Sequence, residues 1–344
     1  MPDNSPILSF LVVTHNHEHY VRRCLDSILC QSIKYSFEII VGDDNSSDNT
    51  WIIIQEYKER FPTLFTVYQI NSDDCAPLTP ADRASYNRGK AYSLIRGKYY
   101  TEIDGDDYLI QGNTYQKQVE LLEKNPACWL CMQNISYLKE GEPLSSATKR
   151  YSDDELNNFQ IIDANEYISH PFMFSQHQAF VYRRNTLCNP IDNLGLDYED
   201  TTATLFHLQF GSIIYLNQSG YQYISYPFGI NNLLSGNDRT VCLALLEIEH
   251  CIFFPVFRTA ILKASLPKLI HLLKMEVNGV LVLSSTSRIS FSRYSGFIFR
   301  YFEKENHSLY ESFRIRVIRL FSVILSRTHS NKNWLFQILF RLFV

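Results

Sequence analysis

The first part of the chain alternates between short apolar runs and stretches in which apolar residues recur at helical spacing. Ile7–Val13 is an apolar run of strand length, which is typical of a parallel strand buried on both faces. After a polar loop, the spacing of apolar residues predicts a helix over Tyr20–Leu29. Phe37–Val41 and Leu64–Ile70 predict two further strands. This order of elements is that of βαβ units.

The same alternation continues to about residue 126. A helix follows the second predicted strand, with Ser47 or Asp48 as its cap, and a later helix ends near Ile95. An aromatic-rich strand then runs to Ile103, and another helix begins at Asn113. We therefore predict an α/β fold with a Rossmann-type mixed, mostly parallel sheet flanked by helices. In open sheets of this kind, ligands bind outside the carboxyl ends of the strands.

Three carboxylates crowd a turn directly after the strand that ends at Ile103. The turn reads Asp104-Gly105-Asp106-Asp107. Packed carboxylates repel one another, so the cluster is costly unless positive charge lies among them. Hard oxygen ligands suit Mg²⁺ or Mn²⁺, and Mg²⁺ usually binds through one or two carboxylates plus substrate phosphates. The cluster favours a site for a cation and a diphosphate; the alternative is a solvated Asp-Gly turn.

Other polar residues lie after the earlier strands. Asp43 and Asp44 directly follow the second predicted strand, so one cleft would hold them together with Asp104 and Asp106. Three histidines within residues 15–19 also suggest a metal site, but they lack a clear ligand pattern.

Composition narrows the function classes. A length of 344 residues is enough for one large or two ordinary domains, and 45% hydrophobic residues indicate a globular protein with a core. The net charge of -4 gives no general reason to expect nucleic acid as a partner. No uninterrupted apolar stretch reaches the roughly 18 residues of a spanning helix, and we see no secretory signal.

Cysteine usage favours a reducing compartment. Eight cysteines in a chain of this length are too sparse for a disulfide scaffold, and reduced thiols in the cytosol are the simpler interpretation. Cys128 and Cys131 form a CxxC pair within an apolar run, which favours a buried segment over a redox site.

Several separate motifs occur along the first 110 residues. They are Thr14-His15-Asn16, Leu25–Gln31, Glu38–Thr50, and Gly97–Tyr100 running into Asp104–Asp107. In this order and spacing they resemble the family 2 glycosyltransferases of GT-A fold, and the resemblance covers roughly residues 7–230. It implies an inverting transfer of a sugar from a nucleotide diphosphate donor, usually a UDP-sugar.

The resemblance also implies roles for residues around the donor. Asp44 would accept a hydrogen bond from the N–H of the base ring. Asp104 would mainly face the ribose, while Asp106, assisted by Asp107, would contact a divalent cation, Mg²⁺ or Mn²⁺. Such a cation neutralises the leaving diphosphate. The full set expected to bind the donor is Thr14, His15, Asn16, Asp43, Asp44, Arg83, Asn87 and Asp104.

One stretch departs from the family pattern. The family often carries Ala-Arg-Asn before the strand that leads to the acidic turn, whereas this chain has Ser85-Tyr86-Asn87. Tyr86 therefore occupies the usual arginine position. Either Arg83 or Arg88 would then cover the diphosphate, or the pocket differs.

The second half would supply the acceptor side. The segment 176–184 resembles a family strand that ends in arginine, and His177 on it would contact the acceptor or the metal; a structural histidine is the alternative. Glu199 and Asp200 resemble the family's Glu-Asp motif at a helix start. The resemblance implies that Asp200 is the general base for the acceptor hydroxyl and that Glu199 shapes the acceptor site. The alternative is an acidic first turn that complements the helix dipole.

We expect a glycosyltransferase domain over residues 1–235, with a nucleotide-binding half to about 125 and an acceptor half over 126–235. A helical region would follow over 236–344. There Arg316, Arg319 and Arg327 lie opposite an apolar helical face, which suits an anionic membrane surface. The alternative is a helix that packs on the catalytic domain or on a second subunit of a homo-oligomer.

These observations favour a cytoplasmic glycosyltransferase, peripheral at the inner face of the cell membrane, that builds a surface polysaccharide on a glycan or lipid-linked acceptor. The sequence contains no Gln-x-x-Arg-Trp motif, which argues against a processive synthase. One rival is a sugar nucleotidyltransferase, which would need a Gly-rich, basic loop after the first strand. A second is a non-catalytic module that binds nucleotide sugars. A Rossmann dehydrogenase is disfavoured because no GxGxxG follows a strand.

Overall fold

The computed structural model describes residues 5–70, 80–110, 112–139, 141–142, 148–149, 159–169, 180–186, 200–225, 250, 254–261 and 263–264. The chain divides into two compact units, Met1–Pro227 and Phe228–Val344. All of the described candidate site residues belong to the first unit.

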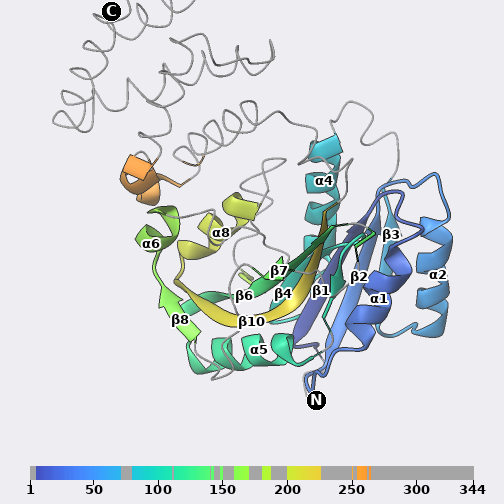
Figure 1. Ribbon diagram of the computed structural model, residues 1–344, viewed down its shortest axis with the longest axis horizontal. Coiled ribbons are helices and arrows are strands. Elements are labelled where there is room, and N and C mark those ends of the chain that lie inside the picture. Colours follow the sequence, from blue (N-terminus) through green and yellow to red (C-terminus); the bar gives the residue numbers. More distant parts are fainter. Residues whose placement is uncertain are drawn as a thin grey trace, which may run out of the picture. The chain divides into compact units, whose positions relative to one another are not determined.

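The N-terminal half of the sheet is entirely parallel. Its strands lie in the order β3-β2-β1-β4, so that β1 is flanked by β2 and β4 (Figure 1). The strands are β1 (Leu8–Thr14), β2 (Phe37–Asp43), β3 (Phe65–Gln69) and β4 (Tyr99–Asp104). The predicted strands are therefore confirmed, with shifts of one or two residues at their ends.

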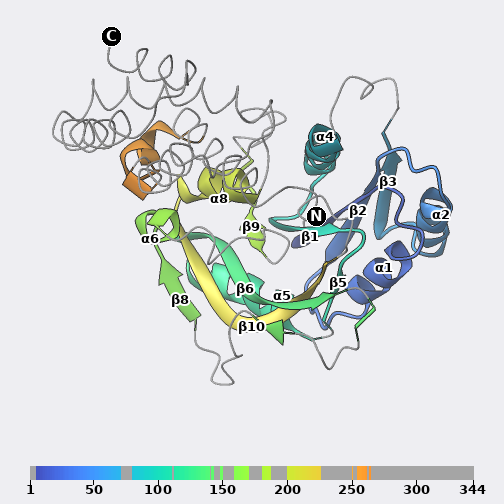
Figure 2. The same cartoon turned by 45° about the horizontal axis from the view of Figure 1, so that its top comes forward.

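Three helices connect these strands. They are α1 (Val21–Leu29), α2 (Thr50–Arg60) and α4 (Pro80–Ser93). The chain steps outward from β1 to β3 and then returns past β1 to form β4. Because such crossovers are right-handed, α4 lies on the opposite face of the sheet from α1 and α2 (Figure 2). This places α4 over the ends of β1 and β2, where the candidate nucleotide residues lie.

The second half of the sheet is mixed. From β4 the order continues β9-β6-β10-β5, with β7 beside β6 and β8 beside β10, which makes a ten-stranded sheet among the described residues. The strands are β5 (Tyr108–Leu109), β6 (Cys128–Lys139), β7 (Thr148–Lys149), β8 (Phe159–Ile162), β9 (Val181–Arg183) and β10 (Ser212–Ser225). The helices are α5 (Thr114–Lys124), α6 (Ala164–Ser169) and α8 (Asp200–Leu208). The longest ladders are parallel, and the predicted mixed, mostly parallel sheet is confirmed.

The core follows from the spacing of apolar residues. In α1, Val21, Cys24, Leu25 and Ile28 are buried, and positions three and four apart share one face of a helix. On β6, Cys128 and Cys131 are buried free thiols, and burial raises the pKa of both. Buried, protonated thiols are unreactive, which agrees with the predicted buried segment.

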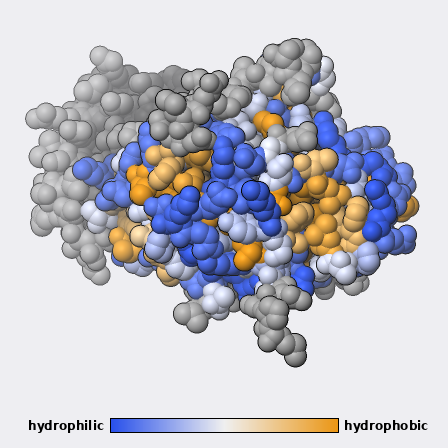
Figure 3. All heavy atoms as spheres, turned by 90° about the horizontal axis from the view of Figure 1, so that it is seen from below, coloured by the Kyte–Doolittle hydropathy of each residue, from blue (hydrophilic) through white to orange (hydrophobic). Residues whose placement is uncertain are grey.

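Apolar surface remains outside the core, as in most proteins. Figure 3 shows one face of the molecule, where hydrophobic areas alternate with hydrophilic ones. In the part of the chain that the structure describes, no helix is long and apolar enough to cross a membrane.

The predicted helical region 236–344 lies mostly outside the described residues. Within that region the structure gives a short 3-10 helix, Pro255–Phe257, with proline at its start. The arginine-bearing segment with the predicted membrane contact is not among the described residues.

Candidate active site

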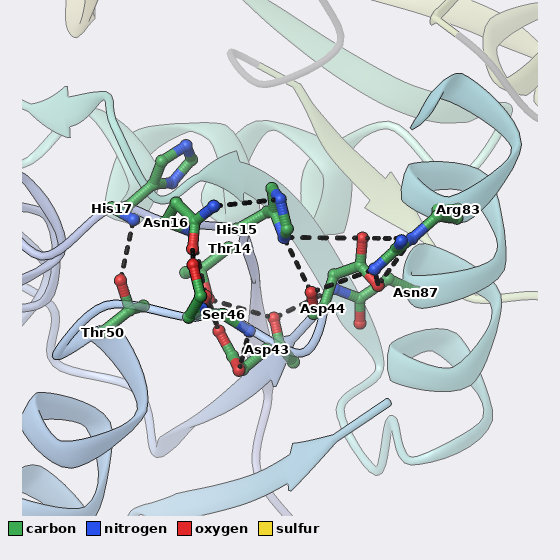
Figure 4. A network of polar contacts seen from close by, with 12 residues as sticks. Thr14, His15, Asn16, His17, Asp43, Asp44, Ser46, Thr50, Arg83 and Asn87 are labelled. Atoms are coloured by element: carbon green, nitrogen blue, oxygen red, sulfur yellow. Dashed lines mark hydrogen bonds and ion pairs between the residues drawn. The ribbon is translucent and has the colours of Figure 1, made fainter. Parts of the chain in front are cut away.

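The loops after β1 and β2 are bonded to each other. Asn16 and Asn45 adopt positive φ values of 54° and 49°, a conformation that asparagine tolerates better than most residues. The Asn16 backbone N–H donates to Ser46 Oγ at 2.9 Å, and the Ser47 N–H donates to Asn16 Oδ1 at 2.8 Å (Figure 4). The two loops therefore form one rigid edge at the carboxyl ends of the strands.

Asp43 organises this edge from below. Its carboxylate is fully buried and accepts hydrogen bonds from Thr14 Oγ1 at 3.1 Å, the Ser46 N–H at 3.0 Å and Gln69 Nε2 at 2.9 Å. The Ser46 hydroxyl also donates to it. Because these donors come from three different strand ends, Asp43 fixes the loops in place. Its predicted contact with the donor stays a prediction.

Asp44 lies next to Asp43 but faces a cation. Arg83 of α4 donates from Nη2 to Asp44 Oδ1 at 2.9 Å and from Nε to Oδ2 at 3.0 Å, a bidentate pair. His15 Nδ1 lies 2.7 Å from the Asp44 carbonyl oxygen. Since a carbonyl only accepts, Nδ1 carries the proton, and Nε2 is left to accept from Asn16 Nδ2 at 3.2 Å. The His15 side chain is 50% exposed, so this cluster borders open space.

Asn87 anchors α4 to the sheet. Its Nδ2 donates to the Gly42 carbonyl at 3.0 Å, and its Oδ1 accepts from the Tyr68 hydroxyl at 2.8 Å. A Cβ on Gly42 would lie 2.2 Å from Asn87 Oδ1, so only glycine permits this approach. Asn87 is buried, and its amide is used within the chain. Tyr86, at the family's usual arginine position, is 38% exposed.

The acidic turn after β4 separates its three carboxylates. Asp104 accepts from Arg88 Nη2 at 2.8 Å and remains 27% exposed. Burial raises the pKa of the Asp106 carboxyl, His17 opposes that rise, and the negative charge of Asp104 adds to it. Asp107 is buried and accepts from the Tyr221 hydroxyl at 2.5 Å and the Ile224 N–H at 2.9 Å.

Asp107 therefore ties the turn to β10 and does not assist Asp106 as the sequence suggested. Burial raises the pKa of Asp107 well above its usual range, with the charges of Asp106 and Asp104 adding to the rise. The sequence gave no means of separating Asp106 from Asp107, because their partners lie more than a hundred residues further along the chain.

Asp104 and Asp106 are the residues that could hold a cation. Among the described residues, no group of three or more His, Cys, Asp or Glu side chains is arranged to hold a metal ion. A cation that binds through one or two carboxylates and completes its shell with phosphate oxygens needs no such group. The crowding that raises the pKa of Asp106 is also relieved by a nearby positive charge. The pair thus fits Mg²⁺ or Mn²⁺ that arrives with a diphosphate.

The three histidines after β1 have separate environments. His15 belongs to the Asp44 cluster. The His17 N–H donates to Thr50 Oγ1 at 2.7 Å, and its carbonyl accepts from the Val21 N–H at 2.8 Å, so its backbone starts α1. His19 is exposed, 3.5 Å from Glu18.

On the acceptor side, Asp200 is the first residue of α8. His177 and Glu199 lie outside the described residues. The structure adds a residue that the sequence did not single out: His207 of α8 is fully buried against Tyr100 and Tyr182. The only sequence signal was its place in an apolar stretch after Asp200.

Comparisons with known proteins give the chain its family. The model of the glycosyl transferase family 2 matches residues 9–187, more than half of the chain. An uncharacterized protein of Mycobacterium tuberculosis is 31% identical over 135 residues, which are 39% of this chain and 36% of that protein. A poly(ribitol-phosphate) beta-glucosyltransferase of Bacillus spizizenii is 30% identical over 104 residues, 30% of this chain and 15% of that enzyme. The matched stretches thus span well under half of these relatives.

A solved structure extends the likeness beyond the matched stretches. The 1–349 fragment of S. aureus TarS, in complex with UDP-GlcNAc, superposes with a TM-score of 0.59 at 16% identity. The superposition covers 86% of this chain and 81% of that fragment, and it shows a shared fold. From the family match and this fold we conclude that the chain belongs to glycosyl transferase family 2.

Proposed function

We propose that the protein transfers a sugar from a UDP-sugar to a glycan or lipid-linked acceptor, with inversion and with the help of a divalent cation. The observation that carries this proposal is the placement of two acidic sites on either side of β1. Thr14 is in register with Asp43 on β2, and Val13 is in register with Asp104 on β4. Two strand spacings, about 10 Å, separate β2 from β4. A nucleoside bound at one site can reach the other with its diphosphate.

The β2 side suits the base. A uracil ring has one N–H between two carbonyls, and the Asp44 carboxylate would accept from that N–H. Arg83, already held by Asp44, would donate to a neighbouring carbonyl. Thr14, His15 and Asn16 line the same edge, and TarS, which shares the fold, has been solved with UDP-GlcNAc.

The β4 side suits the diphosphate. Asp106 would hold the cation, while Asp104, oriented by Arg88, would face the ribose. When bound, the cation supplies Lewis-acid stabilisation of the leaving diphosphate. Arg88 is paired with Asp104 and Arg83 with Asp44, so both arginines lie at the site through carboxylates.

The α8 side supplies the acceptor chemistry. An acceptor hydroxyl must lose its proton as it attacks the anomeric carbon, and Asp200 at the start of α8 would accept that proton. Attack on the face opposite the leaving diphosphate inverts the anomeric centre. Glu199 and His177 would border the acceptor. The glucosyltransferase relative acts on a poly(ribitol-phosphate), which supports a polymeric acceptor.

The test is product analysis with a panel of nucleotide sugars in the presence of Mn²⁺. We expect UDP to be released, with retention of the sugar on an added acceptor. Release of pyrophosphate would instead indicate a nucleotidyltransferase. Tight binding of a UDP-sugar without turnover on any acceptor would favour a binding module.

A further inference from the structure

The imidazole of His207 is a fixed, neutral link inside the protein. His207 is fully buried. Its Nδ1 lies 2.7 Å from the Ala203 carbonyl oxygen one turn earlier in α8, so Nδ1 carries the proton. Its Nε2, 3.2 Å from the Tyr100 hydroxyl, is then an acceptor, and the hydroxyl donates. Both ring nitrogens are thereby used, and the tautomer is set.

Aromatic rings hold the imidazole on its other sides. The Tyr182 ring centroid lies 4.6 Å from that of His207, and Tyr182 stacks on Tyr100 at 5.0 Å with an interplanar angle of 20°. Tyr100 belongs to β4, Tyr182 to β9, and His207 to α8. The three rings therefore join one helix to two neighbouring strands.

The two ends of this link lead to the two halves of the proposed site. Asp200 begins α8 and stands seven residues before His207, about 10 Å along the helix axis. Asp104 ends β4 and stands four residues after Tyr100 on the same face of the strand. The hydrogen bond between Tyr100 and His207 is thus a direct polar contact between the base helix and the donor strand.

A histidine is a costly way to fill an apolar core. Burying an imidazole loses solvation that an aliphatic side chain would not lose, and hydrogen bonds only compensate for it. What the hydrogen bond adds is direction, because it fixes the rotation and the height of α8 on the sheet. A displacement of about 1 Å at a reacting group can cost on the order of a hundredfold in rate.

We propose that His207 is a positioning residue for the transfer: its hydrogen bond with Tyr100 holds the helix that starts at Asp200 at the correct distance from the donor. This inference rests on the proposed function, because it takes Asp200 as the base. His207 itself touches neither substrate.

The experiment compares Tyr100→Phe, which removes one oxygen, with His207→Leu, which keeps apolar volume. Each should lower kcat by about tenfold to a hundredfold and leave the donor KM within about twofold. The double variant should be no slower than the slower single one, since both remove the same bond. Tyr182→Phe, which leaves the bond between Tyr100 and His207 in place, is the matched control and should keep near-normal kcat. If His207→Leu fails to fold, Tyr100→Phe carries the test.

Unchanged kcat in Tyr100→Phe, or full multiplication of the two losses, would overturn the proposal and leave His207 as a core residue. Combination with Asp200→Asn separates this failure from failure of the base assignment. If Asp200→Asn is slow and His207→Leu slows it no further, both assignments hold. If His207→Leu still imposes its full loss on Asp200→Asn, His207 does not act through the base. Normal turnover in Asp200→Asn alone removes the base and the positioning role with it.

Discussion

Arg88 Nη2 donates a 2.8 Å hydrogen bond to Asp104 Oδ1, and the Nε of the same guanidinium lies 3.7 Å from Glu102 Oε2. Glu102 and Asp104 are two residues apart on β4 and therefore share one face of the strand. The Glu102 side chain is only 4% exposed. One arginine thus balances two carboxylates at the end of the strand that delivers the acidic turn.

Arg88→Met should destabilise the protein because it leaves the buried Glu102 carboxylate without this partner. We expect a loss of about 3 kcal/mol, the lower end for breaking a buried pair, since Asp104 stays partly hydrated. Denaturant unfolding at pH 7 measures this. Arg22→Met is the matched control, because its pair with Glu56 is about half exposed on both sides and should be worth less than about 1 kcal/mol. Equal losses in the two variants would contradict the balancing role.

Asp106→Ala should remove most of the activity and the Mn²⁺-dependent part of UDP binding. The reason is that Asp106 would be a protein ligand of the cation, whereas the base would still bind near Asp44. Calorimetric titration of UDP with and without Mn²⁺ measures both parts. Metal dependence equal to that of the unmodified protein would remove Asp106 from the site.

Asp200→Asn keeps the size of the side chain but removes the proton acceptor. General-base catalysis is typically worth about 10²–10⁴-fold, so kcat should fall by that factor. Donor affinity should barely change, because the donor is held at the ends of β2 and β4. Weak UDP binding together with poor thermal stability would instead favour a role in capping α8.

Stability should depend on pH through His207. Burial lowers the pKa of His207 from 6.5 to about 4 in the folded protein, while hydrogen bonding to the Ala203 carbonyl and the charge of Glu102 oppose this. The unfolded chain therefore binds more protons between these two values, and the stability that neutral His207 contributes is lost as the pH falls from 6.5 toward 4.

The measurement is the difference in unfolding free energy between wild type and His207→Leu across this range. The difference should shrink by up to about 1.4 kcal/mol for each unit below pH 6.5 and be constant above it. The difference is used because the buried carboxyls of Asp106 and Asp107, whose pKa values are raised, act in the opposite direction in both proteins. A difference independent of pH would show that His207 does not stay neutral on folding.

The arginines near the C-terminus carry a prediction from sequence alone. Replacing Arg316, Arg319 and Arg327 by glutamine should weaken binding to anionic vesicles by about 1 kcal/mol for each charge. Sedimentation with anionic and with neutral vesicles measures it. Binding that is unchanged by the substitutions would favour packing against protein.

Local patterns were sufficient for the elements that carry the site. Buried parallel strands are apolar throughout, so Ile7–Val13 and Phe37–Val41 were recognisable as strands, and the carboxylates after them necessarily meet at one edge. Side-chain partners were not recognisable, because they depend on residues distant in sequence. Asp106 and Asp107 are adjacent, yet only Asp107 turns to Tyr221 on β10.

The chemistry of His207 was hidden for the same reason. In the sequence it is one polar residue in an apolar helix. Its neutral state follows from Tyr100 and Tyr182, which lie on strands formed before and after the helix's own neighbours in the chain. The residues with family motifs were predicted, and those specific to this chain came from the structure.

The left-handed turns at Asn16 and Asn45 have a thermodynamic consequence. Because the two loops are already bonded to each other, the nucleotide does not have to order them when it binds. Ordering a flexible segment consumes part of the interaction free energy in most ligand-induced closures. Here that loss is small, so discrimination among bases reflects the hydrogen bonds that each base makes, and the ability of the loop to adapt to a poorly matched base is correspondingly low.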